Sequence, residues 1–194
     1  MSPTLRGALF SLTAFGLYAT HDVVVKFLGA SYAPFQTIFF STLLSFPLVT
    51  LMLMRDRTDG NLRPRQPVWV AIRTGAAILN VVAAFYAFSV LPLAQAYAIF
   101  FAMPLLITLL AIPILGERVG MRRGLAVAAG LVGVIIVLRP GQAEFGLGQF
   151  SALGAAVTGS LVSIIVRKIG QEERSAVLML YPMVAVFRYS MLDG

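Results

Sequence analysis

Between two apolar segments, residues 94–115 and 122–138, lies the sequence Leu115-Gly116-Glu117-Arg118-Val119-Gly120. Each segment falls within the roughly 17–25 residues that an α-helix needs to cross the hydrocarbon core of a bilayer. The charged turn therefore predicts two successive membrane-spanning helices. We expect Glu117 and Arg118 to form a salt-bridged structural turn where these helices meet at one membrane surface.

The composition of the whole chain favours the same fold class. Of its 194 residues, 59% are hydrophobic and 12% are charged, and the mean hydropathy is +0.88. Soluble domains carry about 25% charged residues because a globule must cover itself with polar surface. The absence of cysteine excludes disulfides, thiolate chemistry and cysteine-based metal sites. We therefore expect an all-α polytopic membrane protein that needs no metal and no cofactor.

The apolar segments predict about seven transmembrane helices in this chain. They lie near residues 7–29, 34–54, 68–90, 94–115, 122–138, 147–166 and 175–192. The first is too long for the apolar part of a signal peptide and has no small-residue cleavage site after it, so we interpret it as a spanning helix. The short connections leave no room for a separate soluble domain.

The basic residues are distributed unevenly between the two predicted membrane faces. Twelve of the fifteen fall on one side, namely Arg6, Arg55, Arg57, Arg63, Arg65, Arg73, Arg118, Arg122, Arg123, Arg167, Lys168 and Arg174. The opposite loops hold only Arg139, while Lys26 and Arg188 lie within spans. Because cytoplasmic loops are enriched in Lys and Arg, we expect a cytoplasmic N-terminus. The net charge of +7 is explained in this way and does not indicate nucleic-acid binding.

An internal repeat is visible at an offset of 141 residues. It places residues 7–29 on residues 148–170, and aligns Lys26 with Arg167 and Gly29 with Gly170. Five helices separate the two copies, so the second copy crosses the membrane in the opposite sense, as in the inverted repeats of secondary transporters. We expect a first five-helix repeat at residues 1–141 and an incomplete second repeat at residues 147–194. With a repeat of this length, a complete chain would run to roughly 280–290 residues, so we interpret this one as truncated at its C-terminus.

The segment from Leu91 to Gly141 resembles the second half of an EamA-like domain of the drug/metabolite transporter superfamily. It combines a proline-containing helix, the Gly116-Glu117-Arg118 turn, a glycine-rich helix and a closing Arg-Pro-Gly. Asp22, Lys26, Gly29, Pro34, Gln36 and Phe39-Phe40 are similar to the metabolite-exporter branch. The resemblance implies a ten-helix carrier with both termini inside and a central cavity between the repeats. Many members carry an arginine after the Phe-Phe pair, where this chain has Ser41, so no role of that arginine transfers.

Charged side chains inside the spans are the first candidates for substrate binding, because each costs about 2.5–3.5 kcal/mol at the bilayer centre. Asp22 and Lys26 are four residues apart and share one face of the first helix, so they can pair and would suit a zwitterionic substrate. Alternatively, Lys26 reaches the lipid headgroups and Asp22 neutralises it. His21 points about 100° away from Asp22 on a helix, so we do not expect the two to form a catalytic dyad.

Polar residues of the third and fourth spans are further candidates for lining the cavity. They are Asn80, Tyr86, Gln95 and Tyr97, together with Met103 and Pro104. Pro104 frees a backbone carbonyl one turn earlier, which is tolerated only where protein or cavity water satisfies it. The alternative role for the polar side chains is hydrogen bonding between helices.

Together these features predict a secondary transporter, an exporter or exchanger of small organic metabolites, working by alternating access in the lipid bilayer of a bacterial cytoplasmic membrane. An oligomerising half-size exporter subunit, which would be a homo-oligomer, and an inactive truncated carrier stay open as alternatives. An intramembrane enzyme is disfavoured because the chain has one histidine, no cysteine and no carboxylate pair. A retinal receptor is disfavoured because the last span has no lysine. The chain also lacks a Walker-type phosphate loop, so the energy would come from a gradient.

Overall fold

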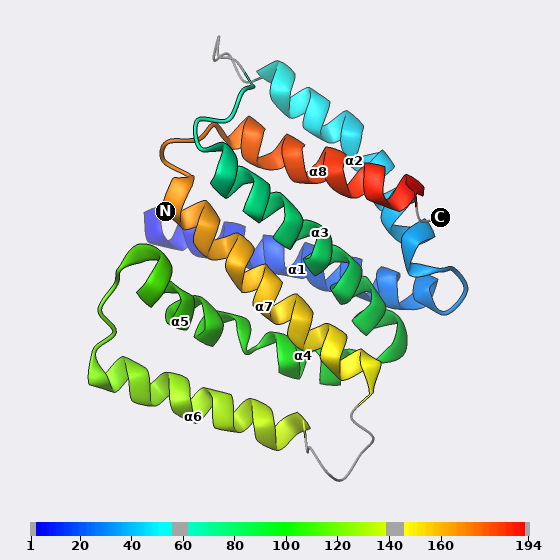
Figure 1. The fold of residues 1–194 in the computed structure, drawn as a ribbon. Helices are drawn as coiled ribbons and strands as arrows, with labels where there is room; N and C mark the ends of the chain where they lie inside the picture. The colour runs from blue at the N-terminus through cyan, green and yellow to red at the C-terminus, as the bar shows by residue number, and fades with distance from the viewer. Residues whose placement is uncertain (1–2, 56–61, 139–145, 193–194) are drawn as a thin grey trace.

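The computed structural model describes residues 3–55, 62–138 and 146–192, and in these residues it contains helices and no strands (Figure 1). The helices are α1 (Pro3–Gly29), α2 (Pro34–Arg55), α3 (Pro67–Val90), α4 (Leu93–Phe100), α5 (Met103–Leu115), α6 (Met121–Leu138), α7 (Leu147–Ile169) and α8 (Ser175–Leu192). Arg57, Arg139 and the closing Arg-Pro-Gly lie outside the described residues.

The all-α polytopic fold class is confirmed. Every predicted span coincides with a helix, and α4 and α5 together cover the predicted span 94–115. Five spans among the described residues are long and apolar enough to cross a membrane: Thr4–Gly29, Pro67–Val90, Leu93–Leu115, Leu147–Ile169 and Ser175–Leu192. The apolar stretch of α2 is shorter, Phe35–Leu51.

The predicted single helix at 94–115 is broken into α4 and α5, which differs from the expectation. Pro104 has no N–H to donate to the carbonyl one turn earlier. The N–H of Ala102 donates instead to the Ile99 carbonyl at 2.9 Å, which tightens the last turn of α4. The N–H of Leu106 then donates to the Ala102 carbonyl at 2.9 Å, and the helix resumes as α5.

The centre of the bundle is the contact between α3 and α7, which lie side by side in Figure 1. The buried face of α7 consists largely of small residues, among them Ala152, Ala155, Ala156, Gly159 and Ser160. Small side chains let helix backbones approach closely, which drives helix association inside a bilayer where burial from water supplies little. α7 also packs on α4 and α5, so it joins most of the preceding helices together.

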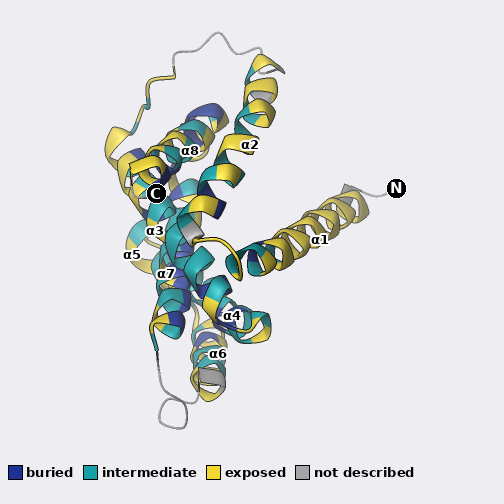
Figure 2. Cartoon of the chain, turned by 90° about the vertical axis from the view of Figure 1, so that its right-hand side faces the viewer, coloured by how far each residue is buried: buried dark blue, intermediate teal, exposed yellow. Residues whose placement is uncertain are grey.

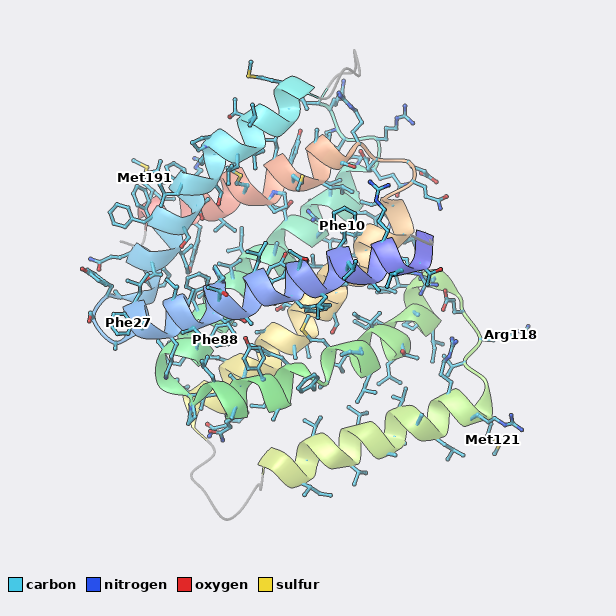
Figure 3. All side chains as sticks on the ribbon, turned by 180° about the vertical axis from the view of Figure 1, so that it is seen from behind. Phe10, Phe27, Phe88, Arg118, Met121 and Met191 are labelled. Carbon is cyan, nitrogen blue, oxygen red and sulfur yellow. The ribbon has the colours of Figure 1, made fainter. Side chains whose placement is uncertain are left out.

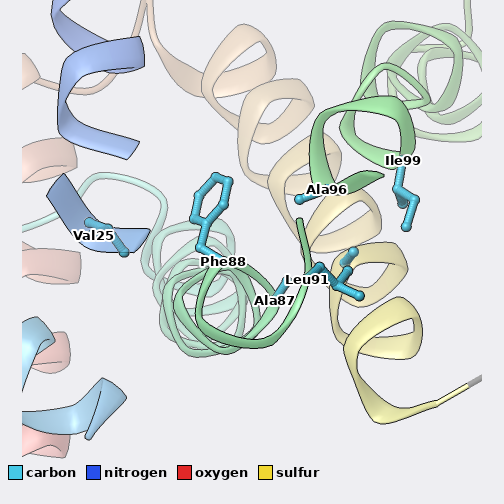
Figure 4. Packing of buried hydrophobic residues seen from close by; sticks show 7 residues of the cluster. Val25, Ala87, Phe88, Leu91, Ala96 and Ile99 are labelled. Carbon is cyan, nitrogen blue, oxygen red and sulfur yellow. The ribbon is translucent and has the colours of Figure 1, made fainter. Parts of the chain in front are cut away.

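Two hydrophobic clusters lie at opposite ends of this central pair. One gathers Val25 of α1, residues of the α3–α4 junction and Ala152 of α7 (Figure 4). The other gathers Val70, Ala111 and Ile164 with neighbouring residues of α7 and α8. The two clusters fix both ends of α7 against the rest of the bundle.

The helix α1 lies at the periphery and projects away from the bundle over its N-terminal half (Figure 2). Its large side chains there are exposed, including Phe10, which is 66% exposed, and Phe15, which is 73% exposed. The most extensive contacts of α1 are with α3, followed by α2. The helix α6 lies at the edge of the bundle farthest from α2 and α8, with Met121 at its start 84% exposed (Figure 3).

The predicted repeat offset of 141 residues also relates the helix starts. α2 begins at Pro34 and α8 begins at Ser175, and α2 and α8 pack against each other. α1 ends at Gly29, while α7 is followed by Gly170 as its C-cap. The division into two inverted repeats stays a prediction, and its boundary at residue 141 lies outside the described residues.

Candidate substrate cavity

A cavity of about 400 Å³ lies between α1, α2, α3 and α8. It falls within the range of roughly 300–1,000 Å³ that small-molecule sites occupy. Its lining residues come from all four helices: His21, Ile38, Ser41, Thr42, Ser45, Ala77, Val81, Phe85, Pro182, Met183 and Val186. α8 belongs to the predicted second repeat, so helices of both predicted repeats contribute to the cavity.

The polar wall of the cavity comes mainly from α2, whose residues Ser41, Thr42 and Ser45 follow helical spacing and share one face. The hydroxyl of Thr42 donates to the Ile38 carbonyl at 2.8 Å, and that of Ser45 donates to the Ser41 carbonyl at 2.8 Å. These bonds to the preceding turn satisfy the hydroxyl protons within α2. The oxygens keep lone pairs for a ligand.

His21 brings a second polar group from α1 and is held by a short chain of contacts. Its Nδ1 lies 3.0 Å from Oδ1 of Asp22, and Oδ2 of Asp22 accepts the hydroxyl of Tyr97 at 2.6 Å. The His21 ring also meets the edge of Phe85, with ring centroids 6.1 Å apart. The two neighbours His21 and Asp22 meet despite their angular separation on the helix, which differs from the expectation that they point apart.

Lys26 does not pair with Asp22, although the sequence allows this pair. Its ammonium donates to the Leu91 carbonyl at 2.7 Å and to the Ser89 carbonyl at 3.2 Å. Carbonyls at a helix C-terminus have no intrahelical donor and carry partial negative charge, so a cation is stabilised there. Lys26 thus tethers α1 to the end of α3, and the zwitterion site expected from an Asp22–Lys26 pair is not assembled in this structure.

Asn80, Met103 and Pro104 lie where α3 and α5 meet α7. The Asn80 amide donates to the Ala155 carbonyl of α7 at 2.7 Å. The Ser160 hydroxyl lies 3.2 Å from the Met103 carbonyl, beside the helix break before Pro104. These contacts match the alternative role in helix association, and a role in substrate binding stays a prediction.

Tyr86 and Gln95 are half-buried on α3 and α4. Neither of them lines the cavity, and neither do Asp22, Lys26, Asn80, Tyr97, Met103 or Pro104. The α2 hydroxyls were not among the predicted site residues. The signal that points to them is a polar stripe on one face of an otherwise apolar helix.

Glu117 has a different partner from the one expected within its turn. Its Oε1 accepts a hydrogen bond from Nη2 of Arg167 at 2.5 Å, so the ion pair joins the α5–α6 turn to the end of α7. Gly116 has φ of 70°, a left-handed conformation that glycine adopts without strain, and this ends α5. Lys168 adds a bond to the Ile114 carbonyl at 2.7 Å, and its Nζ lies 4.3 Å from the Trp69 ring centroid.

More polar contacts gather at the same end of the bundle, where α3 begins and α7 ends. Oε1 of Glu173 accepts the N–H of Gln66 at 2.5 Å, and the Gln66 amide donates to Glu172. Arg73 of α3 donates to the Leu178 carbonyl of α8. The predicted basic side of the membrane is thus a network of contacts between segments more than 100 residues apart in sequence.

The sequence profile of the EamA-like transporter family matches residues 5–139 of this chain. Among curated proteins, the "Riboflavin transporter" of Vibrio cholerae is 26% identical over 97% of this chain and 64% of its own length. The "S-adenosylmethionine uptake transporter" of Rickettsia prowazekii is 23% identical over 96% of this chain and 63% of its length.

A further relative, the "Riboflavin transporter" of Rhizobium johnstonii, is 27% identical over 94% of this chain and 61% of its own length. The chain therefore spans less than two thirds of the length of these relatives. No solved structure matches the chain significantly.

Proposed function

Because this chain belongs to the EamA-like transporter family, we propose that it takes part in the transport of a small organic metabolite, which binds in the cavity between α1, α2, α3 and α8. The observation that carries the proposal is the position of this cavity. It combines helices of the first predicted repeat with α8 of the second, and gating of one group of helices against another around such a site exposes it to each membrane face in turn.

The packing of the helices supports a division into a fixed and a moving part. α3 and α7 share the most extensive contact and carry the buried small residues. α1 and α2 contact each other sparingly, and most of the α1 surface is exposed. We infer that α1 and α2 move against the α3–α7 pair when the cavity opens.

A matched pair of substitutions on α3 tests the cavity. Ala77 lines it, whereas Gly75 is exposed and has nothing within 4 Å of the position of an added Cβ. Ala77→Leu is expected to lower the uptake of riboflavin or S-adenosylmethionine into proteoliposomes roughly tenfold or more, because added methylenes obstruct a fitted pocket. Gly75→Leu should leave uptake near the parent value. Equal uptake by the two variants would contradict this site.

We further propose a location in the bacterial cytoplasmic membrane with the N-terminus inside. The proposal is supported by the basic residues, most of which lie on the same predicted membrane side as the N-terminus. The chain has no native cysteine, so single cysteines can be labelled without background. Ser31→Cys, after α1, is expected to react with a membrane-impermeant maleimide on intact cells. Gly120→Cys, before α6, should react only after the cells are permeabilised. The reverse pattern would place the N-terminus outside.

The same charge distribution bears on how copies of the chain could associate. Two copies inserted in the same orientation are related by an axis along the membrane normal. Inverted repeats require an axis in the membrane plane. A same-orientation homo-oligomer therefore cannot supply inverted counterparts of α3 to α6 by symmetry, and we favour transport through the cavity of a single chain.

A further inference from the structure

Two hydroxyl oxygens of the polar wall, those of Thr42 and Ser45, act as hydrogen-bond acceptors. Both residues donate their hydroxyl protons to carbonyls of α2, each at 2.8 Å. A hydroxyl has one proton and two lone pairs, so each oxygen still accepts a bond. A ligand that meets these two oxygens binds them with N–H or O–H donors.

His21 adds a third acceptor because Asp22 determines its tautomer. An ionised carboxylate only accepts hydrogen bonds, so the proton between Nδ1 and Oδ1, 3.0 Å apart, belongs to the ring. The second carboxylate oxygen is held by the Tyr97 hydroxyl at 2.6 Å. In the neutral ring, Nε2 then carries the lone pair and accepts a donor.

The remainder of the lining is apolar and includes Phe85, Met183 and Val186. Aromatic and thioether side chains pack well against planar rings. Among the residues that the structure describes, no Asp, Glu, Lys or Arg lines the cavity. Asp22 does not line the cavity, and its two oxygens contact Nδ1 of His21 and the Tyr97 hydroxyl.

We propose that this cavity selects an uncharged, planar heteroaromatic metabolite that carries hydroxyl or imide donors, with His21 as a specificity-determining acceptor positioned by Asp22 and Tyr97. This proposal rests on the proposed transport function and names its substrate class. The donors bind Thr42, Ser45 and His21, and the ring plane packs against Phe85 and Met183. A cation or a phosphate ester enters without a counter-ion and is disfavoured.

The relatives are named for two substrates, riboflavin and S-adenosylmethionine, which serve as an uncharged and a charged probe of this cavity. Riboflavin is neutral, planar and hydroxylated, whereas S-adenosylmethionine has a permanently charged sulfonium. A charge without a partner inside a membrane protein costs about 2.5–3.5 kcal/mol, which corresponds to about 100-fold in affinity. We expect the chain in lipid nanodiscs to bind riboflavin at least that much more tightly than S-adenosylmethionine or riboflavin 5′-phosphate.

Substitutions on α2 test the acceptor wall directly. The double variant Thr42→Val and Ser45→Ala is expected to weaken riboflavin binding about 10- to 100-fold, because each lost hydrogen bond contributes up to about tenfold. Thr50→Val is the matched control. Thr50 makes the same bond to its preceding turn, to the Phe46 carbonyl at 2.8 Å, but does not line the cavity. An equal loss of affinity in the control would overturn the acceptor wall.

Asp22→Asn tests the positioning of His21. An asparagine amide can donate to Nδ1, which moves the ring proton to Nε2 and turns the acceptor into a donor. Riboflavin binding is expected to fall about tenfold, while Asp22→Glu, which keeps a carboxylate, retains most of it. Retention of full affinity by Asp22→Asn would overturn the role of His21.

The outcomes separate this proposal from the transport function. Binding of S-adenosylmethionine as tightly as riboflavin, with both lost in Ala77→Leu, would overturn the substrate class and keep the cavity. If the chain binds neither riboflavin nor S-adenosylmethionine, and Ala77→Leu takes up as much of either as the parent does, both the substrate class and the cavity are overturned. Preferential riboflavin binding that depends on Thr42 and Ser45 supports both.

Discussion

The helices α1 and α7 occupy equivalent places in the predicted repeat, yet their surroundings differ. In the most apolar 18-residue window, 39% of α7 residues are buried, compared with 6% of α1 residues. α7 packs on α3, α4 and α5, whereas α1 lies against α3 and sparingly against α2. The comparison teaches that a repeat sets the shape of a helix, while burial depends on which neighbours are present.

The side chains of α1 and α7 differ in size as well as in burial. The buried face of α7 presents small residues such as Ala152, Ala156 and Gly159. At the offset of 141 residues, these three residues align with Ser11, Phe15 and Tyr18 of α1, and Phe15 and Tyr18 are bulky and about 70% exposed. Small residues permit close backbone contact, whereas bulky apolar residues suit lipid or loosely packed neighbours. α1 is therefore held mainly by polar tethers and α7 by packing.

Gly159→Leu should have the largest effect of the changes that probe this comparison. A Cβ added at Gly159 would lie 2.7 Å from Met103 Cε and 2.8 Å from Asn80 Nδ2, so a leucine must separate α7 from α3 and α5. Over-packing of this kind costs about 1–3 kcal/mol. The free energy of unfolding in a detergent titration should fall by that amount. Gly16→Leu on α1, where nothing lies within 4 Å, should change it by less than about 0.5 kcal/mol.

Lys26→Met should act locally on α1, whereas Gly159→Leu acts on the whole bundle. It removes the bonds from the ammonium to the Ser89 and Leu91 carbonyls, and bonds of this charged kind contribute about 1.5–3 kcal/mol. Hydrogen exchange measured by mass spectrometry should accelerate in α1. Arg167→Met, at the aligned position of α7, removes an ion pair whose side chains are 58% and 33% exposed, which contributes about 0–1 kcal/mol. Greater loss of protection in α7 than in α1 would argue against this account.

Asn80→Ala should have the smallest effect of the three. It removes the 2.7 Å hydrogen bond to the Ala155 carbonyl of α7, and such bonds between membrane helices average about 0.6 kcal/mol. Riboflavin affinity should stay unchanged because Asn80 does not line the cavity. Thr20→Ala is the control on α1, since its hydroxyl bonds only the Gly16 carbonyl of its own helix. If Asn80→Ala loses riboflavin binding while its stability is unchanged, Asn80 takes part in substrate binding after all.

The candidate site was predicted less completely than the fold. The sequence identified the polar residues of α1, α3 and α4 inside spans, because an isolated charge or amide in an apolar run is conspicuous. It did not identify the partner that each would choose. Lys26 found carbonyls at the end of α3, and Glu117 found Arg167 rather than a neighbour in its turn. These partners are distant in the sequence, so spacing along one helix could not reveal them.

The sequence by itself determined the helices, their approximate limits and the family. Apolar runs of spanning length leave the backbone no alternative to a helix inside a bilayer. Only the tertiary structure decided which prolines interrupt a helix. Pro47, Pro113 and Pro182 lie within α2, α5 and α8, whereas the chain breaks before Pro104, where α7 brings Ser160 to the Met103 carbonyl. It also decided the cavity, because Ser41, Thr42 and Ser45 face His21, Phe85 and Met183 only after four helices pack together. Local propensity is a property of neighbouring residues, but a site between helices depends on contacts across the whole bundle.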